Sequence, residues 1–396
     1  MPECRTIPFA RPWVTPEDRR AVMEALDAPV LMQGPQAASF EREFASFLGD
    51  GAHCVAVSSC VAALHLAYLV LRIGAGDEVV VPAQAHTTTV HAVEWVGAKP
   101  VFVDCDPTTG NVTAEGVAAA VTLRTRAISV VHFVGIPCQM DAIMAVAEEC
   151  NLKVIEDCAL ALGARYRGKH VGLFGDVGCF SFYPARHITT GEGGMFVSRH
   201  REAAESARSL HALGVNRTLK DAATPGLYDV QALGFSYGMS ELQAALGRAQ
   251  LRRIEENLAR RRANFEALED QLSDLPNVRI LGPTQPDAES SHFCLTLVLE
   301  RRLASRRNEV VARLNAAGIG TNIYYPQPVP RMSYYRGKYG YDVADSPQAE
   351  QISDHSLALP VGPHMSVQDI SYMAREFRKT LRNLDSVLSP VAIKSY

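Results

Sequence analysis

The chain has 396 residues, of which 47% are hydrophobic and 21% charged, and its formal net charge is −4. This length is sufficient for a large core and for two domains. The small net charge argues against nucleic acid or an anionic membrane surface as a partner. Because the sequence contains neither a signal-like N-terminus nor an apolar run of about 18 residues, we expect a cytoplasmic protein.

Nine cysteines are scattered along the chain without a CxxC pair. Several lie inside apolar segments that are typical of strands. This distribution favours reduced core thiols in a reducing compartment over a disulfide framework or a metal site.

The first two-thirds of the chain alternate amphipathic helices with short apolar strands. A helix is predicted to begin after Thr15, a suitable N-cap, with Pro16 at its first position. Strands are predicted at Glu78–Val81 and in the segments KPVFVDCD, RAISVVHFVG, KVIEDCA and GCFSFYP. The alternation predicts an α/β fold with a mostly parallel sheet flanked by helices, whose ligands bind at the carboxyl ends of the strands.

A long helical pattern runs from Ser240 to about Leu272, where Ser240 and Gln243 form a capping-box pair. The pattern then changes to an alternating strand, HFCLTLVLE, followed by a helix that ends at Gly318 and a final helix in DISYMAREFRKTL. We therefore predict a large domain at 1–274 and a smaller C-terminal α+β domain at 275–396.

Several predicted strand ends carry polar groups. Asp157 ends the apolar strand KVIED, and a carboxylate there needs a cation or a hydrogen-bond donor. His86 follows another strand, where it is either a core residue or a ring stacked on a flat ligand. The small-residue turn SSCVAAL offers backbone amides to a phosphate. Each signal has an ordinary structural explanation when it is taken alone.

In this order, the segments GPQAASFEREFASFLG, GDEVVVPAQAHTTTVHAVEWVGAKPVFVDCDP, VIEDCALALGA, SFYPARHITTGEGGM and MSELQAALGRAQL resemble the DegT/DnrJ/EryC1/StrS family of sugar aminotransferases. The resemblance covers nearly the whole chain. It implies the type I fold of enzymes that use pyridoxal phosphate (PLP), a homodimer with sites at the subunit interface, and a keto sugar attached to a nucleotide as substrate.

The resemblance also implies roles for individual residues. Asp157 matches the aspartate that pairs with the pyridine nitrogen, and His86 matches the residue that stacks on the ring. Ser181 matches a phosphate contact, and Cys60 and Val61 lie at the phosphate turn.

The small-domain stretch NIYYPQPVPRMSYYRGKYGY lies near the mouth of the site in the family. There Tyr324, Tyr325 and Arg331 are candidate substrate contacts, although a tyrosine-rich packing loop explains them equally well. Glu192, in the intact glycine turn, is a further candidate.

Other positions depart from the family pattern. Arg186 stands where the family has the lysine that forms a Schiff base with PLP. Val61 replaces a threonine, Leu160 replaces a polar residue that reaches the cofactor, and Ser236 and Gly238 replace the residues of the family's Asn-Tyr-Arg-Met turn. Ala85 also departs from the usual threonine.

A guanidinium keeps its proton, with a pKa above about 12, and is a poor nucleophile and a weak base at neutral pH. Arg186 is therefore not expected to hold PLP covalently or to support ordinary transamination. We expect PLP or pyridoxamine phosphate (PMP), if bound, to be held noncovalently and weakly.

Three functions remain open. The first is an enzyme on a sugar or related metabolite that works without the lysine, either with noncovalent PLP or PMP and a base such as His187, or without PLP through Asp157, His86, Arg186 and His187. The second is a non-catalytic paralogue that pairs with an active homologue. The third is an aminotransferase with a trapping substitution, but the additional departures favour a naturally altered site.

Overall fold

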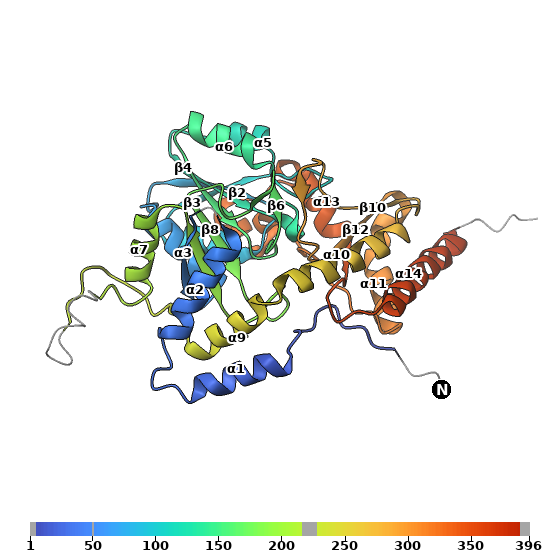
Figure 1. The fold of residues 1–396 in the computed structure, drawn as a ribbon. Helices are drawn as coiled ribbons and strands as arrows, with labels where there is room; N and C mark the ends of the chain where they lie inside the picture. The colour runs from blue at the N-terminus through green and yellow to red at the C-terminus, as the bar shows by residue number, and fades with distance from the viewer. Residues whose placement is uncertain (1–4, 50, 216–227, 389–396) are drawn as a thin grey trace, which may run out of the picture.

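The computed structural model describes residues 5–49, 51–215 and 228–388. Its largest sheet has seven strands in the order β1-β9-β8-β5-β4-β2-β3 (Figure 1). β9 is antiparallel to β1 and β8, and every other neighbouring pair in this sheet is parallel. The predicted α/β fold with a mostly parallel sheet is confirmed. The strands are β1 (His53–Val57), β2 (Glu78–Pro82), β3 (Lys99–Val103), β4 (Thr125–Val131), β5 (Lys153–Asp157), β8 (Val177–Ser181) and β9 (Gly194–Ser198).

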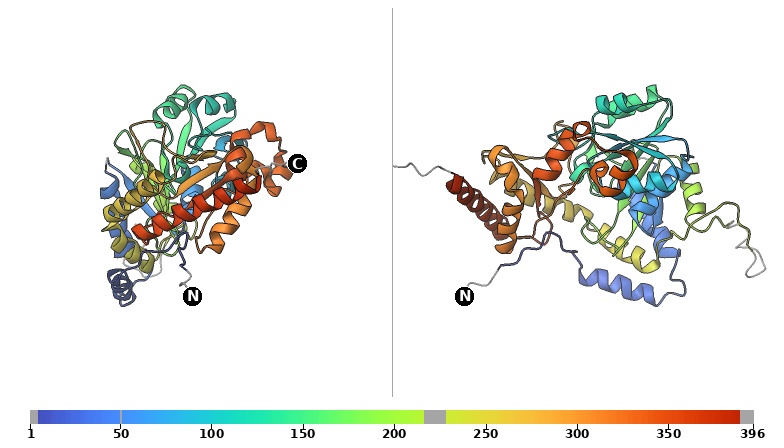
Figure 2. Two further views of the ribbon diagram at one scale, coloured as in Figure 1. Left: turned by 90° about the vertical axis from the view of Figure 1, so that its right-hand side faces the viewer. Right: turned by 180° about the vertical axis from the view of Figure 1, so that it is seen from behind.

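Helices cover both faces of this sheet, as the views in Figures 1 and 2 show. The helices α3 (Cys60–Val70), α4 (Thr87–Trp95) and α7 (Arg201–Leu210) pack together on one face. The other face is covered by α2 (Pro35–Leu48), α9 (Glu241–Leu251), α5 (Ala114–Ala120) and α6 (Met140–Glu149). α1 (Pro16–Leu26) lies along α9.

The two-residue period of the strands distributes side chains between these faces. In β5, Ile155 belongs to the core under α3, whereas Val154 belongs to the core under α5 and α6. Asp157 therefore lies on the α3 face, and its neighbour Glu156 lies on the opposite face.

The C-terminal part has a second sheet, in the order β10-β12-β13, and its own apolar core. The N-terminal segment packs with this part, because Ile7 forms a parallel β-bridge with Ile319. The boundary at 274/275 stays a prediction. The elements are β10 (Val278–Ile280), β12 (Leu295–Leu299), β13 (Ser356–Leu359), α11 (Arg307–Ala316), α12 (Ser333–Tyr339), α13 (Pro347–His355) and α14 (Val367–Leu388). A small third sheet joins β11 (Ala288–Glu289), β6 (Arg165–Tyr166) and β7 (Lys169–His170).

Two helices form the helical pattern predicted from Ser240 to about Leu272. α9 ends at Leu251, and α10 (Ile254–Asp270) starts after Arg253, which has a non-helical backbone (φ −116°, ψ 21°). The guanidinium of Arg253 donates to the buried carboxylate of Asp18 and to the carbonyl of Trp13. The predicted capping pair of Ser240 and Gln243 is confirmed, as is the Thr15 cap of α1.

Among the described residues, no helix combines the length and the apolarity that crossing a bilayer requires. The eight cysteines within the described ranges form no disulfide, and seven of them are buried or half-buried. Cys4 lies outside those ranges.

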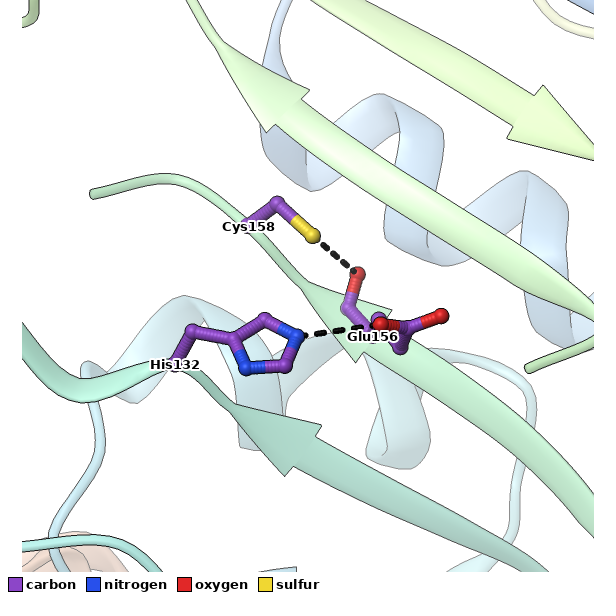
Figure 3. Close-up of side chains that lie close together, drawn as sticks. All are labelled: His132, Glu156 and Cys158. Atoms are coloured by element: carbon purple, nitrogen blue, oxygen red, sulfur yellow. Dashed lines mark hydrogen bonds and ion pairs between the residues drawn. The ribbon is translucent and has the colours of Figure 1, made fainter. Parts of the chain in front are cut away.

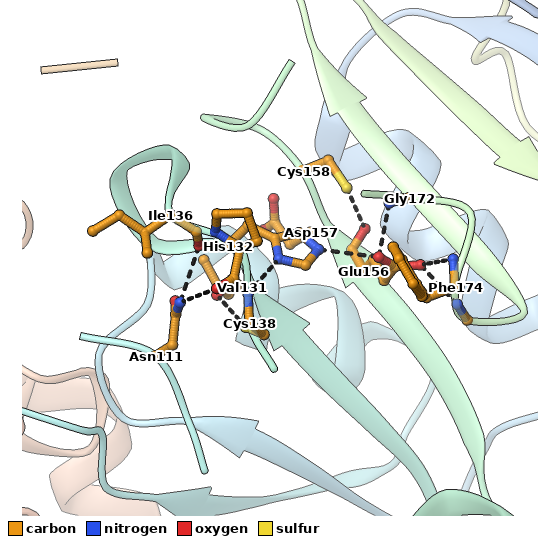
Figure 4. Close-up of polar contacts among 12 residues, drawn as sticks. Asn111, Val131, His132, Ile136, Cys138, Glu156, Asp157, Cys158, Gly172 and Phe174 are labelled. Carbon is orange, nitrogen blue, oxygen red and sulfur yellow. Dashed lines mark hydrogen bonds and ion pairs between the residues drawn. The ribbon is translucent and has the colours of Figure 1, made fainter. Parts of the chain in front are cut away.

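The buried carboxylate of Glu156 joins β5 to the segment that precedes β8 and to His132, which follows β4 (Figure 4). Its Oε1 accepts from the backbone N–H groups of Phe174 and Gly175, at 2.8 and 2.7 Å. Its Oε2 accepts from the N–H of Gly172 at 2.7 Å and lies 3.0 Å from Nε2 of His132. Both side chains are fully buried.

His132, Glu156 and Cys158 together have the spacing of a metal site (Figure 3). The hydrogen bonds of these residues instead indicate a role in stabilising the fold. Nδ1 of His132 accepts from the N–H of Cys138 at 3.1 Å, so the neutral ring carries its proton on Nε2 and donates it to Glu156. The lone pairs of the carboxylate are thereby occupied by four donors. The expectation of no metal site at these residues stays a prediction, and this geometry supports it.

We expect Glu156→Gln to lower the free energy of unfolding by about 3 kcal/mol or more, because the amide nitrogen cannot accept from buried N–H groups. Urea unfolding followed by circular dichroism measures this. The control is Glu202→Gln on the exposed side of α7, which should stay within about 0.5 kcal/mol of the native chain. A Glu156→Gln protein as stable as the control would contradict the assignment.

Candidate cofactor and substrate site

The candidate site lies at the carboxyl edge of the large sheet. Asp157 is the last residue of β5, and Ser181 is the last residue of the adjacent strand β8. α3 and α4 begin directly beyond β1 and β2 at the same edge, since those strands run in the same direction as β5. The fold thus brings polar strand ends and the starts of two helices to one edge of the sheet, although they are far apart in the sequence.

Asp157 is buried, with 5% of its surface exposed. The hydroxyl of Thr89 donates to its Oδ2 at 2.7 Å, and the backbone N–H of Ala159 donates to its Oδ1 at 3.0 Å. These donors offset the desolvation of the carboxylate. One lone pair on each oxygen remains for a further donor.

His86 is the N-cap of α4 and is exposed at the site. Its Nδ1 accepts from the N–H of Thr88 at 3.3 Å and lies 2.8 Å from the hydroxyl of Thr88. Its ring packs edge-on against Tyr325, with 5.5 Å between the ring centroids. Desolvation lowers the pKa of His86 and the charge of Asp157 opposes this. The ring is therefore fixed in orientation and able to lie against a flat ligand.

An anion-binding end is formed by α3. The first turn of a helix has N–H groups without internal acceptors, and here they belong to Cys60 and Val61, since Ser59 Oγ accepts from Ala62. β9 passes close to this turn, because a Cβ on Gly194 would lie 2.6 Å from the nitrogen of Cys60. Burial raises the pKa of the Cys60 thiol well above its usual range, which disfavours the thiolate form.

Arg186 lies beside this anion-binding end. Its Nε donates to Oγ of the buried Ser181 at 3.3 Å, and its guanidinium carbon lies 5.6 Å from the ring centres of Tyr183 and Phe293. Among the described residues, no carboxylate comes within ion-pair distance of it. The charge of the half-buried guanidinium also acts on the pKa values of Cys60, Tyr324, Tyr325 and Glu192, so Arg186 lies within electrostatic reach of these four residues.

The side chain of His187 does not lie free beside Arg186. It is buried, and its Nε2 donates to the carbonyl of Ser291 at 3.0 Å. Ser291 in turn donates to the carbonyl of Leu160 at 2.8 Å. Burial lowers the pKa of His187 well below its usual range. This environment suits a structural role that ties the turn at Arg186 to the segment after β5, and a base at His187 stays a prediction that these contacts do not favour.

The candidate substrate residues differ in their availability. Tyr324 and Tyr325 are more than nine-tenths buried, and they pack with Leu160 and Phe133 in one apolar cluster beside His86. Arg331 is held by Glu350 and Asp354 of α13, so its guanidinium is already neutralised. The exposed Glu192 has its pKa raised by partial burial, which the charge of Arg186 opposes.

The described lysines all lie elsewhere. Four of them form ion pairs with carboxylates away from Asp157, and the fifth lies over the ring of Phe174; they are Lys99, Lys153, Lys338, Lys379 and Lys169. Within the described ranges, no lysine of this chain therefore occupies the site.

Thr89 is a site residue that the sequence interpretation does not single out. A usable signal exists, because His86 and Thr89 are three residues apart at the start of a helix and therefore share a face. Thr89 is not distinguished in the sequence because it is one of three consecutive threonines, a composition that is common at the start of a helix.

Comparisons with known proteins agree with this architecture. Residues 13–378 match the DegT/DnrJ/EryC1/StrS aminotransferase family. The chain belongs to this family. It is 34% identical over 383 residues to the spore coat polysaccharide biosynthesis protein SpsC of Bacillus subtilis, which covers 96% of this chain and 98% of the relative.

Solved structures of family members are also similar. The aminotransferase TlmJ from Streptoalloteichus hindustanus has a TM-score of 0.88 and 32% identity, over 96% of this chain and all of the other. The PMP-form of the sugar aminotransferase Spr1654 from Streptococcus pneumoniae has a TM-score of 0.91 and 26% identity, over 96% of this chain and all of the other. The fold is thus that of the PLP-dependent aminotransferases.

In this family member, the donor set fits a phosphorylated pyridine. Asp157 keeps free lone pairs for a ring N–H, His86 offers a ring face, and the first turn of α3 with Ser181 offers donors to a phosphate. Leu160 lies in the apolar cluster and adds no polar contact. The predicted losses of cofactor contacts at Arg186, Leu160, Val61, Ser236 and Gly238 stay predictions.

The buried His187 predicts a pH dependence of stability. Its folded pKa is depressed, so below its ordinary pKa of about 6.5 the unfolded chain binds a proton that the folded chain does not. Stability is then lost as the pH falls through 6.5, by at most about 1.4 kcal/mol per pH unit. We expect His187→Gln to show a smaller loss than the native chain between pH 7 and 5 in urea unfolding. The exposed His200→Gln serves as control, and equal slopes for native chain and His187→Gln would contradict the prediction.

Proposed function

We propose that this protein is an enzyme of sugar or related biosynthetic metabolism that works at the Asp157 site without a lysine. One observation carries the proposal: Arg186, and none of the described lysines, lies beside Ser181 at the carboxyl edge of the sheet. The polysaccharide-related name of the SpsC relative supports a sugar-related small-molecule substrate. A cytoplasmic homodimer without nucleic-acid partners, as the family implies, is part of this proposal.

The proposed ligand at the base of the site is PMP or PLP, held noncovalently. The PMP- and PLP-forms of Spr1654 support this choice. When bound, such a cofactor supplies an electron-withdrawing ring for chemistry at a carbon attached to nitrogen. Asp157 would accept the ring N–H, His86 would cover one face of the ring, and Ser181 would contact the phosphate.

Arg186 has a different role from a lysine in this proposal. Its Nε is committed to Ser181, and its terminal nitrogens have no acceptor among the described residues, so they are available to an oxyanion. Because a guanidinium stays protonated, Arg186 can hold a phosphate or a substrate carboxylate but cannot move protons at neutral pH. Ordinary transamination is therefore not expected. Tyr324, Tyr325 and Glu192 line the side from which the sugar would enter.

The absence of a covalent link is directly testable. We expect that PLP added to the native chain and reduced with borohydride leaves no modified residue in the Phe180–Ser198 segment by peptide mass mapping. In Arg186→Lys, the same treatment should modify residue 186, because an amine can reach the aldehyde. Surface lysines such as Lys153 provide the internal control for nonspecific labelling. Failure of Arg186→Lys to be labelled would contradict the proposed position of residue 186.

The ionic contact of Arg186 predicts a second effect. We expect Arg186→Met to weaken PMP binding by about 10- to 100-fold in isothermal titration, since a charge-assisted hydrogen bond contributes about 1.5–3 kcal/mol. The same substitution should lower the affinity for pyridoxamine, which lacks the phosphate, much less. Lys153→Met at the opposite end of β5 is the control. Unchanged PMP affinity in Arg186→Met would remove Arg186 from the phosphate contact.

A further inference from the structure

Thr89, in the first turn of α4, donates a side-chain hydrogen bond to Asp157 at the end of β5. Its side chain is completely buried, and its hydroxyl lies 2.7 Å from Oδ2 of Asp157. With Ala159 donating to Oδ1, each carboxylate oxygen has one protein donor. The plane of the carboxylate is thereby fixed, and the lone pairs that remain have defined directions.

The first turn of α4 delivers this hydroxyl together with the ring of His86. The carbonyl of His86 accepts from the N–H of Thr89 at 3.1 Å, and Nδ1 of His86 accepts from Thr88. Thr89 is β-branched and therefore has restricted χ1 freedom in a helix. The ring face and the carboxylate are thus positioned relative to each other through one helical turn.

We propose that Thr89 is a positioning residue that directs Asp157 toward the protonated ring nitrogen of a pyridine ligand. The inference rests on the proposed function, because it requires PMP or PLP at this site. Without the hydroxyl, Oδ2 would have no protein donor in a buried environment, and the carboxylate would turn away from the ligand or recruit water. The benefit of Thr89 is therefore specific to ligands that carry the ring nitrogen.

The test compares two probes on the full-length protein by isothermal titration: PMP, and its 1-deaza analogue, in which a C–H replaces the ring nitrogen. We expect Thr89→Val to lose about tenfold in PMP affinity and little in affinity for the analogue. Thr89→Ser, which restores the hydroxyl, should recover most of the PMP affinity. Thr87→Val is the matched control, because Thr87 lies on the same helix and makes no side-chain hydrogen bond in the described structure.

The outcomes separate the two proposals. Unchanged PMP affinity in Thr89→Val, or an equal loss for both probes, would overturn the positioning role while leaving the proposed function intact. If the native chain binds neither probe, the proposed function falls and this inference falls with it. Should Thr89→Val not fold, Thr89→Ala provides the second variant, and the same ratio of the two affinities decides.

Discussion

The buried carboxylate of Glu156 is the constraint on which the site depends. It has no exposure to water, so each of its lone pairs must be matched by a donor. Three backbone N–H groups from 172–175 and the ring of His132 supply these donors. The segment that leads into β8 and the residue after β4 are thereby fixed to β5 near its carboxyl end (Figure 4).

Asp157 is the next residue on the same strand. The alternation of side chains sends Glu156 to one face, where structural donors enclose it, and Asp157 to the other face, where it lies at the candidate site. Two adjacent acidic residues thus have separate environments. Donors are also divided between them, since backbone amides surround Glu156 whereas Thr89 and Ala159 leave Asp157 partly unsatisfied.

The segment from Ser181 to Gly194 joins β8 to β9 and carries both His187 and Arg186. His187 and Ser291 anchor the turn to the segment at Leu160. Arg186 then extends between Tyr183 and Phe293, where it also donates to the buried Ser181. Its guanidinium brings a permanent positive charge and hydrogen-bond donors to the carboxyl edge of the sheet.

The sequence by itself determined the α/β class, the caps at Thr15 and Ser240, and the family, because periodicity, capping and motif order are local in the chain. The break at Arg253 was decided by tertiary structure, since its ion pair with Asp18 joins residues 235 positions apart. The sequence also did not predict the contact of Thr89 with Asp157 or the burial of His187. Both depend on which strand ends meet at one edge of the sheet, and pairing between distant strands leaves no local pattern in the residues that it brings together.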